Sequence, residues 1–211
     1  MKKSIFSAAL LFAFVFAGLP KTMQAQKYQG QVVIGANCAF SLVGLVMNTA
    51  FNVADRGIVG LSTSVTPGLS GTVDVGVTDR FSLGVSHFYQ SANAHWSTYT
   101  DNNGITHTGD FHYRITRQNT ALRALFHFGD NDDIDPYFGI RLGYSYWSSS
   151  SNIADVDQTF DLSKFKPHLW PQALFGVRYF FIPNLGVNAE IAAGPPYYLS
   201  VGLNARFGGT K

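Results

Sequence analysis

Apolar and polar residues alternate one by one along most of the chain beyond residue 25. The alternation is clearest near the C-terminus, where every second residue is apolar: Tyr197, Leu199, Val201, Leu203, Ala205 and Phe207. A period of two is that of a β-strand with one apolar face, whereas an amphipathic helix repeats about every 3.6 residues. The final segment is therefore predicted to be a strand.

The same alternation marks earlier segments, at residues 69–77, 81–85, 138–146, 171–181 and 185–193. Residues 119–128 follow it less cleanly, and residues 31–42 are mostly apolar, so the register of this first strand stays open. Together these segments predict an all-β chain with eight antiparallel strands.

The connections between these strands alternate in length. Short turns are expected at residues 78–80, 129–135 and 182–184, and long loops at about 43–64, 93–112 and 148–168. Outer-membrane barrels have short periplasmic turns and longer extracellular loops, so the spacing predicts a closed barrel with both termini in the periplasm. The last hairpin, at residues 194–196, departs from the pattern because its outer loop is very short.

The two faces of the strands differ in a way that favours a membrane barrel over a soluble, ligand-carrying one. The apolar face carries no charge, and the opposite face is rich in Gly, Ser and Asn, which suit a narrow lumen. Aromatic residues gather at the strand ends, as in the girdles of transmembrane barrels. These are Phe81, Phe128, Phe181 and Phe207 at one rim, and Tyr144, Tyr146, Trp170 and Tyr197 at the other.

Composition and the N-terminus agree with export. Lys2 and Lys3 precede an apolar run at residues 5–19, and a small residue follows at Ala25. This is the pattern of a secretory signal peptide at residues 1–25, cleaved near Ala25, followed by one barrel domain at residues 26–211. Charged residues make up only 13% of the chain, yet no later apolar run reaches the ~20 residues of a spanning helix. We therefore expect the outer membrane of a Gram-negative bacterium.

The remaining composition excludes other classes. A single Cys rules out an internal disulfide, and a scattered net charge of +2 does not indicate nucleic-acid binding. The expected partners are outer-membrane lipid and lipopolysaccharide, with a protein partner at the extracellular loops. The first long loop, at residues 43–64, is mostly apolar, which favours contact with lipid or a docked partner.

Isolated charges on the inward face are the main candidate site. At about 3.3 Å per residue, most of them lie at similar heights above the periplasmic turns. We interpret them as a structural network of ion pairs that plugs the lumen, because an unpaired buried charge is costly. Arg178 and Glu190, on the two strands of one hairpin, are expected to pair. The full set is Asp74, Arg123, Arg141, Arg178, Glu190 and Arg206.

Other chemistry has weaker support. His95, His107 and His112 lie in or beside the second long loop, and Asp130, Asp132, Asp133 and Asp135 resemble part of a calcium loop without its Gly and Glu. Solvated residues are the simpler interpretation, so no metal or cofactor is expected. Ser86, His87 and Ser91 come nearest to a hydrolase site, but adjacent strand residues face opposite sides.

Three stretches resemble the bacterial outer-membrane β-barrel domain family related to OmpX and OmpW. They are residues 69–90, the turn-to-strand segment at 135–139, and Gly176-Val177-Arg178-Tyr179 followed by Glu190. The resemblance implies a small outer-membrane barrel but no particular activity, since such barrels include adhesins, pores and lipid-modifying enzymes. Unlike many of them, the chain continues past its last aromatic residue, Phe207.

The sequence therefore predicts a non-enzymatic, porin-like outer-membrane barrel with a structural or loop-mediated interaction role. A small pore for solutes or ions, and a lipid-modifying enzyme, are the alternatives.

Overall fold

The computed structural model describes residues 29–41, 59–100, 103–129, 131–152 and 168–208, and all its regular structure is β-strand. The strands in chain order are β1 (Val32–Phe40), β2 (Ser62–Val65), β3 (Gly68–Gly76), β4 (Phe81–Thr100), β5 (Thr106–His127), β6 (Ile134–Ser151), β7 (His168–Ile182), β8 (Leu185–Ala193) and β9 (Leu199–Phe207). In the described part of the chain, no helix is long and apolar enough to cross a membrane.

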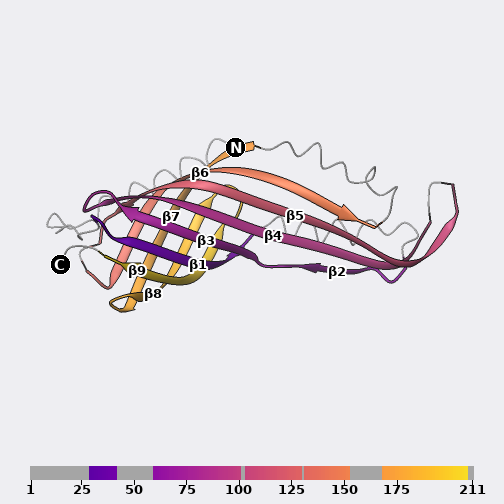
Figure 1. The fold of residues 1–211 in the computed structure, drawn as a ribbon, viewed down its shortest axis with the longest axis horizontal. Coiled ribbons are helices and arrows are strands. Elements are labelled where there is room, and N and C mark those ends of the chain that lie inside the picture. Colours follow the sequence, from indigo (N-terminus) through magenta and orange to yellow (C-terminus); the bar gives the residue numbers. More distant parts are fainter. Residues whose placement is uncertain (1–28, 42–58, 101–102, 130, 153–167, 209–211) are drawn as a thin grey trace, which may run out of the picture.

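Eight of these strands close into one antiparallel barrel (Figure 1). From β3 to β9 each strand pairs with the next, and β1 pairs with both β9 and β3. The short β2 adds only to the outer part of β4, beyond the end of β3. The predicted eight-stranded antiparallel barrel is confirmed. The register of the first strand, which the sequence left open, places Val33 opposite Asp74 on β3 and Arg206 on β9.

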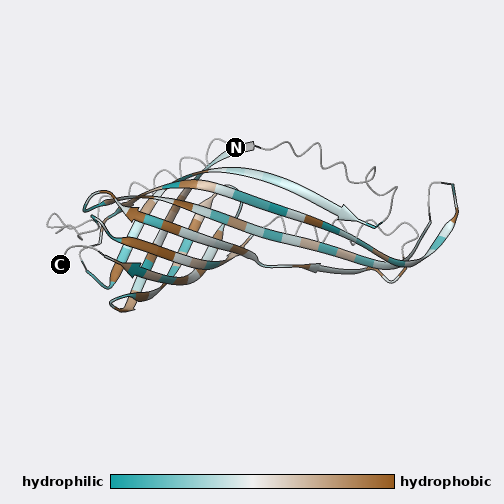
Figure 2. Cartoon of the chain, in the orientation of Figure 1, coloured by the Kyte–Doolittle hydropathy of each residue, from teal (hydrophilic) through white to brown (hydrophobic). Residues whose placement is uncertain are grey.

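Figure 2 shows hydrophobic and hydrophilic residues alternating in bands along the strands of the barrel, and the exposure of the side chains shows that the apolar ones face outward. Side chains such as Leu122, Ile140 and Leu203 are more than half exposed on the outer wall. Their inward neighbours on the same strands, such as Arg123, Arg141 and Asn204, are at most 3% exposed. This arrangement inverts that of a soluble barrel and is that of a transmembrane β-barrel.

Three strands run far beyond the closed part and form an arm (Figure 1). The arm consists of the outer ends of β4, β5 and β6, together with β2. The predicted loop at 93–112 is therefore wrong, because β4 and β5 stay paired out to Thr100 and Thr106. A physical reason lies in an apolar cluster on one face of the arm, where Trp96, Tyr113 and Ile115 are buried together.

The short connections are close to those predicted, with one informative difference. The turns at 78–80 and 182–184 are confirmed, whereas β6 begins at Ile134, inside the predicted turn at 129–135. Asp135 is consequently a strand residue, and it is completely buried. The interpretation of this residue as part of a solvated turn is wrong.

The connection from β8 to β9 changes which residues face inward. Gly194 has a φ of +114°, and Pro195 and Pro196 follow before β9 begins at Leu199. Across this bend the alternation shifts, so Tyr197 is 1% exposed and Tyr198 is 41% exposed. The prediction of Tyr197 in an outer aromatic girdle is therefore wrong, whereas Tyr144, Tyr146 and Trp170 do lie exposed at that end.

Several predictions fall outside the described residues. They are the signal peptide at 1–25, most of the apolar first loop, Asp130, most of the third loop, and the C-terminal residues 209–211.

Candidate functional site

Charged side chains from five strands meet inside the barrel. The alternation of each strand turns every second residue inward, so single charges on separate strands come together in the lumen. In the described part of the chain, seven charged side chains are almost fully buried there, not counting His127. They are Asp74 on β3, Arg117 and Arg123 on β5, Asp135 and Arg141 on β6, Arg178 on β7, and Glu190 on β8.

Asp74 lies at the centre of the network and holds two arginines. Its Oδ1 accepts a hydrogen bond from Arg123 Nε at 3.1 Å, and its Oδ2 accepts one from Arg178 Nη2. Gly84 lies opposite Asp74 on β4, and a Cβ there would stand 2.1 Å from Asp74 Oδ1. The glycine therefore makes the room that this carboxylate occupies.

Glu190 forms the second centre. Its Oε2 accepts hydrogen bonds from Arg123 Nη2 and from the Tyr137 hydroxyl, both at 3.0 Å, and its Oε1 accepts one from the Tyr197 hydroxyl at 2.6 Å. Gly176 lies opposite Glu190 in the ladder, and a Cβ there would stand 2.4 Å from the Tyr137 ring. Both oxygens of this buried carboxylate are satisfied, as burial of a charge requires.

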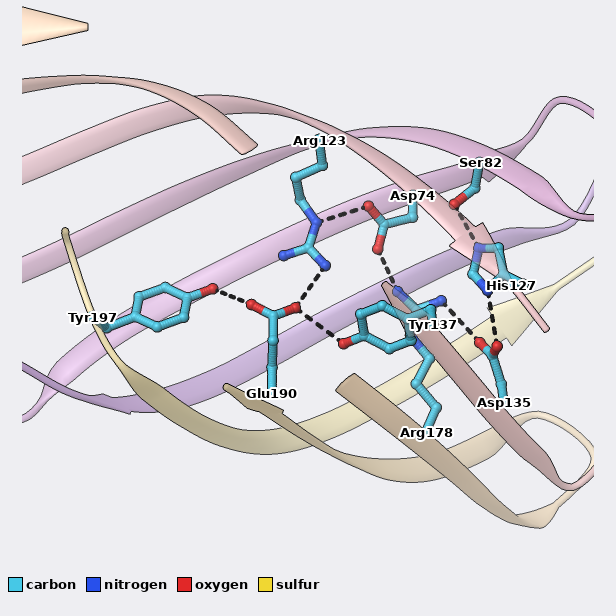
Figure 3. A network of polar contacts seen from close by, with 9 residues as sticks. All are labelled: Asp74, Ser82, Arg123, His127, Asp135, Tyr137, Arg178, Glu190 and Tyr197. Carbon is cyan, nitrogen blue, oxygen red and sulfur yellow. Dashed lines mark hydrogen bonds and ion pairs between the residues drawn. The ribbon is translucent and has the colours of Figure 1, made fainter. Parts of the chain in front are cut away.

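A third group extends the network towards the periplasmic turns. Arg178 Nη1 donates to Asp135 Oδ2 at 3.3 Å, and Asp135 Oδ1 lies 2.8 Å from His127 Nδ1. The other ring nitrogen, His127 Nε2, shares a hydrogen bond of 2.8 Å with Ser82 Oγ. Figure 3 shows the resulting chain of contacts, which runs without a break from Ser82 to Tyr197.

The expected pair of Arg178 and Glu190 does not form. The register places Arg178 opposite Asn188 and Glu190 opposite Gly176, two residues apart along the ladder. At that offset Arg178 reaches Asp74 and Asp135 instead, and Glu190 takes Arg123. Neighbouring positions in one hairpin did not predict the ion pairs, because the lumen is narrow enough for side chains to reach strands on its other side.

The other two residues of the predicted set lie apart from these ion pairs. Arg141 is 1% exposed, and its guanidinium lies over the Tyr197 ring with its carbon 4.3 Å from the ring centre. Arg206 is only half-buried and donates to the backbone oxygens of Pro183 and Asp132. Arg206 therefore connects two periplasmic turns and is not part of the lumen charge cluster.

Sequence reasoning missed several members of the network. The sequence places Asp135 in a solvated turn, and it does not indicate that Ser82, His127, Tyr137 or Tyr197 belongs to the network. Most of them carried a usable signal, because Tyr137 and Asp135 have the same strand parity as Arg141, and His127 has that of Arg123. Tyr197 had no such signal, since the bend at Gly194 breaks the parity.

Ser82, His127 and Asp135 have the connectivity of a hydrolytic triad. The hydroxyl meets one ring nitrogen and the carboxylate meets the other, as nucleophilic catalysis requires. All three side chains are at most 2% exposed, and Asp135 also binds Arg178. Of the residues suggested by the sequence, Ser86 faces the lumen, whereas His87 is exposed on the outer wall and shares a hydrogen bond with Thr120. This contrast agrees with the argument against pairing them.

The histidines considered as metal ligands lie on strands of the arm. His95 on β4 and His112 on β5 are paired in the ladder, with ring centres 6.1 Å apart, and His107 stacks on Tyr99. Within the described ranges, no group of three or more His, Cys, Asp or Glu side chains is placed to hold a metal ion.

A cavity of about 510 Å³ opens in the barrel wall where the chain passes from β2 to β3. Its lining includes outward residues of β1 and β9, such as Cys38 and Val201, and the inward residues Gln90 and Ser200. The cavity therefore lies in the wall, beside the outer end of the lumen.

No protein-family model and no curated protein matches the chain. Among solved structures, the outer membrane protein OprG from Pseudomonas aeruginosa aligns with a TM-score of 0.49 and 12% identity, over 88% of this chain and 99% of that one. The N-terminal β-barrel domain of Pseudomonas aeruginosa OprF gives 0.45 and 14%, over 87% and 100%. A designed transmembrane β-barrel gives 0.46 and 12%, over 87% and 100%. The similarity is one of general fold, and no activity follows from it.

Proposed function

We propose that this protein is a non-enzymatic outer-membrane barrel of a Gram-negative bacterium, with a plugged lumen and an arm that serves interactions at the cell surface. The observation that carries the proposal is the unbroken network of buried polar contacts between Ser82 and Tyr197.

The outer wall supports the membrane setting. β9 alone exposes Leu199, Val201, Leu203 and Phe207, each at least 45% accessible. Nine tilted residues at about 3.3 Å each span roughly the 25 Å apolar band of an outer-membrane barrel. Without a bilayer around it, this belt would be a large apolar patch of the kind that soluble monomers rarely expose.

The network supports a plug rather than a pore. An eight-stranded barrel leaves an interior just wide enough for side chains to fill. Here the filling is held by ion pairs between β3, β5, β7 and β8, so the groups that block the lumen are also cross-links between its walls. Opening a continuous path would separate buried opposite charges, which is costly.

The arm supports an interaction role. Its exposed side chains include His95, His112 and Arg114, which differ from the apolar wall of the barrel. Such a surface suits contact with lipopolysaccharide or with a protein partner outside the membrane.

Conductance in planar lipid bilayers tests the plug. We expect the wild-type barrel to give no large, stable channel. A triple variant, Arg123→Ala/Arg178→Ala/Glu190→Ala, removes three long side chains from the lumen and should conduct if it folds. A heat-modifiable band on electrophoresis establishes folding of each protein. Porin-like conductance by the wild type would overturn the plug and favour the pore alternative.

A further inference from the structure

The buried charges of the lumen do not balance. In the described part of the chain, four arginines but only three carboxylates are almost fully buried, and no lysine is among them. The carboxylates Asp74, Asp135 and Glu190 are taken by Arg123 and Arg178. Arg117 and Arg141 form no ion pair with a described carboxylate within 4.0 Å, although the charge of Glu190 acts on Arg141 from a greater distance.

Of these two arginines, Arg141 has more N–H groups without a hydrogen-bond partner among the described residues. Its side chain is buried, and neither Nη1 nor Nη2 has a hydrogen-bond partner within the described part of the chain. The ring of Tyr197 contacts one face of the guanidinium but leaves the in-plane N–H groups unsatisfied. A buried guanidinium in this state is strongly unfavourable unless a further group binds it.

Arg117 lies close to the same point. Its Nη1 donates to the backbone oxygen of Pro196 at 3.2 Å. Pro196 directly precedes Tyr197, whose ring contacts the Arg141 guanidinium. Its Nε is buried and, within the described ranges, unpartnered. Two arginines from β5 and β6 therefore meet at the β8–β9 bend, on the outer side of the Glu190 cluster.

We propose that Arg141 and Arg117 form a binding site for a small free oxyanion, of carboxylate or phosphate chemistry. Two terminal N–H groups of one guanidinium match two oxygens of such a group in a planar, bidentate contact. One bound anion also restores the charge balance of the lumen.

Binding of inorganic phosphate to the refolded barrel tests the site. The protein is kept in an uncharged detergent without lipid, at constant ionic strength, and titrated with phosphate by calorimetry. Tryptophan fluorescence gives a second readout, because Trp147 lies 5.1 Å from the Arg117 guanidinium. We expect saturable binding by the wild type, weakened by about tenfold or more in Arg141→Gln, which loses charged hydrogen bonds.

The controls separate a site from a structural role. Arg114→Gln removes an exposed arginine from β5, the strand that also carries Arg117, and should leave phosphate binding unchanged. Arg141→Gln should unfold at the same or a higher denaturant concentration than the wild type when phosphate is absent, because it removes an unpaired buried charge. Equal phosphate binding by wild type and Arg141→Gln, or no saturable binding by either, overturns the proposal. Binding of lipopolysaccharide but not of free phosphate overturns it too.

Discussion

Asp74 and Glu190 each bind more than one group, and this sharing is what joins separate strands through the lumen. Asp74 takes Arg123 and Arg178, and Arg123 in turn reaches Glu190. A residue in such a network does not have an independent contribution to stability, because its removal leaves its partners buried and charged. Changes within the network are therefore expected to be coupled.

The pair of Arg123 and Glu190 gives a direct measure of this coupling. Glu190→Gln should cost on the order of 3–5 kcal/mol, as expected when one partner of a buried ion pair is removed. Replacing both residues, as Arg123→Met/Glu190→Gln, should cost less than the sum of the two single changes. Urea unfolding of the refolded barrel in detergent measures all three variants, with Arg114→Gln as the exposed control. Strictly additive free energies would show that the two residues do not interact.

Reactivity of Ser82 is a direct test of the proposal that the protein is not an enzyme. The triad-like contacts to His127 and Asp135 are present, but the hydroxyl is buried and Asp135 is shared with Arg178. We therefore expect no covalent labelling of the folded barrel by a fluorophosphonate. Mass spectrometry of the labelled protein, with Ser82→Ala as the matched variant, decides the matter. Labelling that disappears in Ser82→Ala would identify a reactive serine and favour the enzyme alternative.

The sequence predicts strands well where one face of the strand must be buried in lipid. Residues 185–193 and 199–207 keep strict alternation because a shift by one residue would turn polar groups outward. Beyond the membrane this constraint weakens, and the paired strands at residues 93–112 were mistaken for a loop. Pairing there depends on contacts such as Trp96 with Phe111, which lie on different strands and are not visible in either strand alone.

The part of the arm beyond Trp96 and Phe111 should be removable without loss of the barrel. The pairs that close the barrel, β1 with β9 and β1 with β3, lie entirely outside it. Replacing residues 97–110 with Asn-Gly would join Trp96 and Phe111, which are paired, through a two-residue hairpin turn. We expect the shortened protein to keep heat-modifiable migration on electrophoresis. Loss of the folded band would show that the part of the arm beyond Trp96 and Phe111 is needed for closure.

The sequence predicts the closed barrel, but it does not predict which charged side chains contact one another inside it. Alternation and turn spacing are local properties, so eight strands and their inward faces follow from them. Which inward charges meet depends on the stagger of strands around the closed barrel and on the reach of arginine across it. The bend at Gly194 is a second feature that alternation does not predict. It changes which residues face inward, so Tyr197 binds Glu190 instead of facing lipid.

The location of the whole barrel can be tested by one charge on its outer wall. Leu203 lies at the middle of β9 and is 58% exposed. If a bilayer surrounds it, Leu203→Arg should cost about 2–4 kcal/mol, because the guanidinium would enter the apolar midplane. Thr108→Arg, at an exposed position on the arm, should cost almost nothing. Guanidinium titrations of both variants folded into lipid vesicles measure the difference. Equal stabilities would contradict the membrane setting, because a soluble barrel tolerates a charge at an exposed position on its surface.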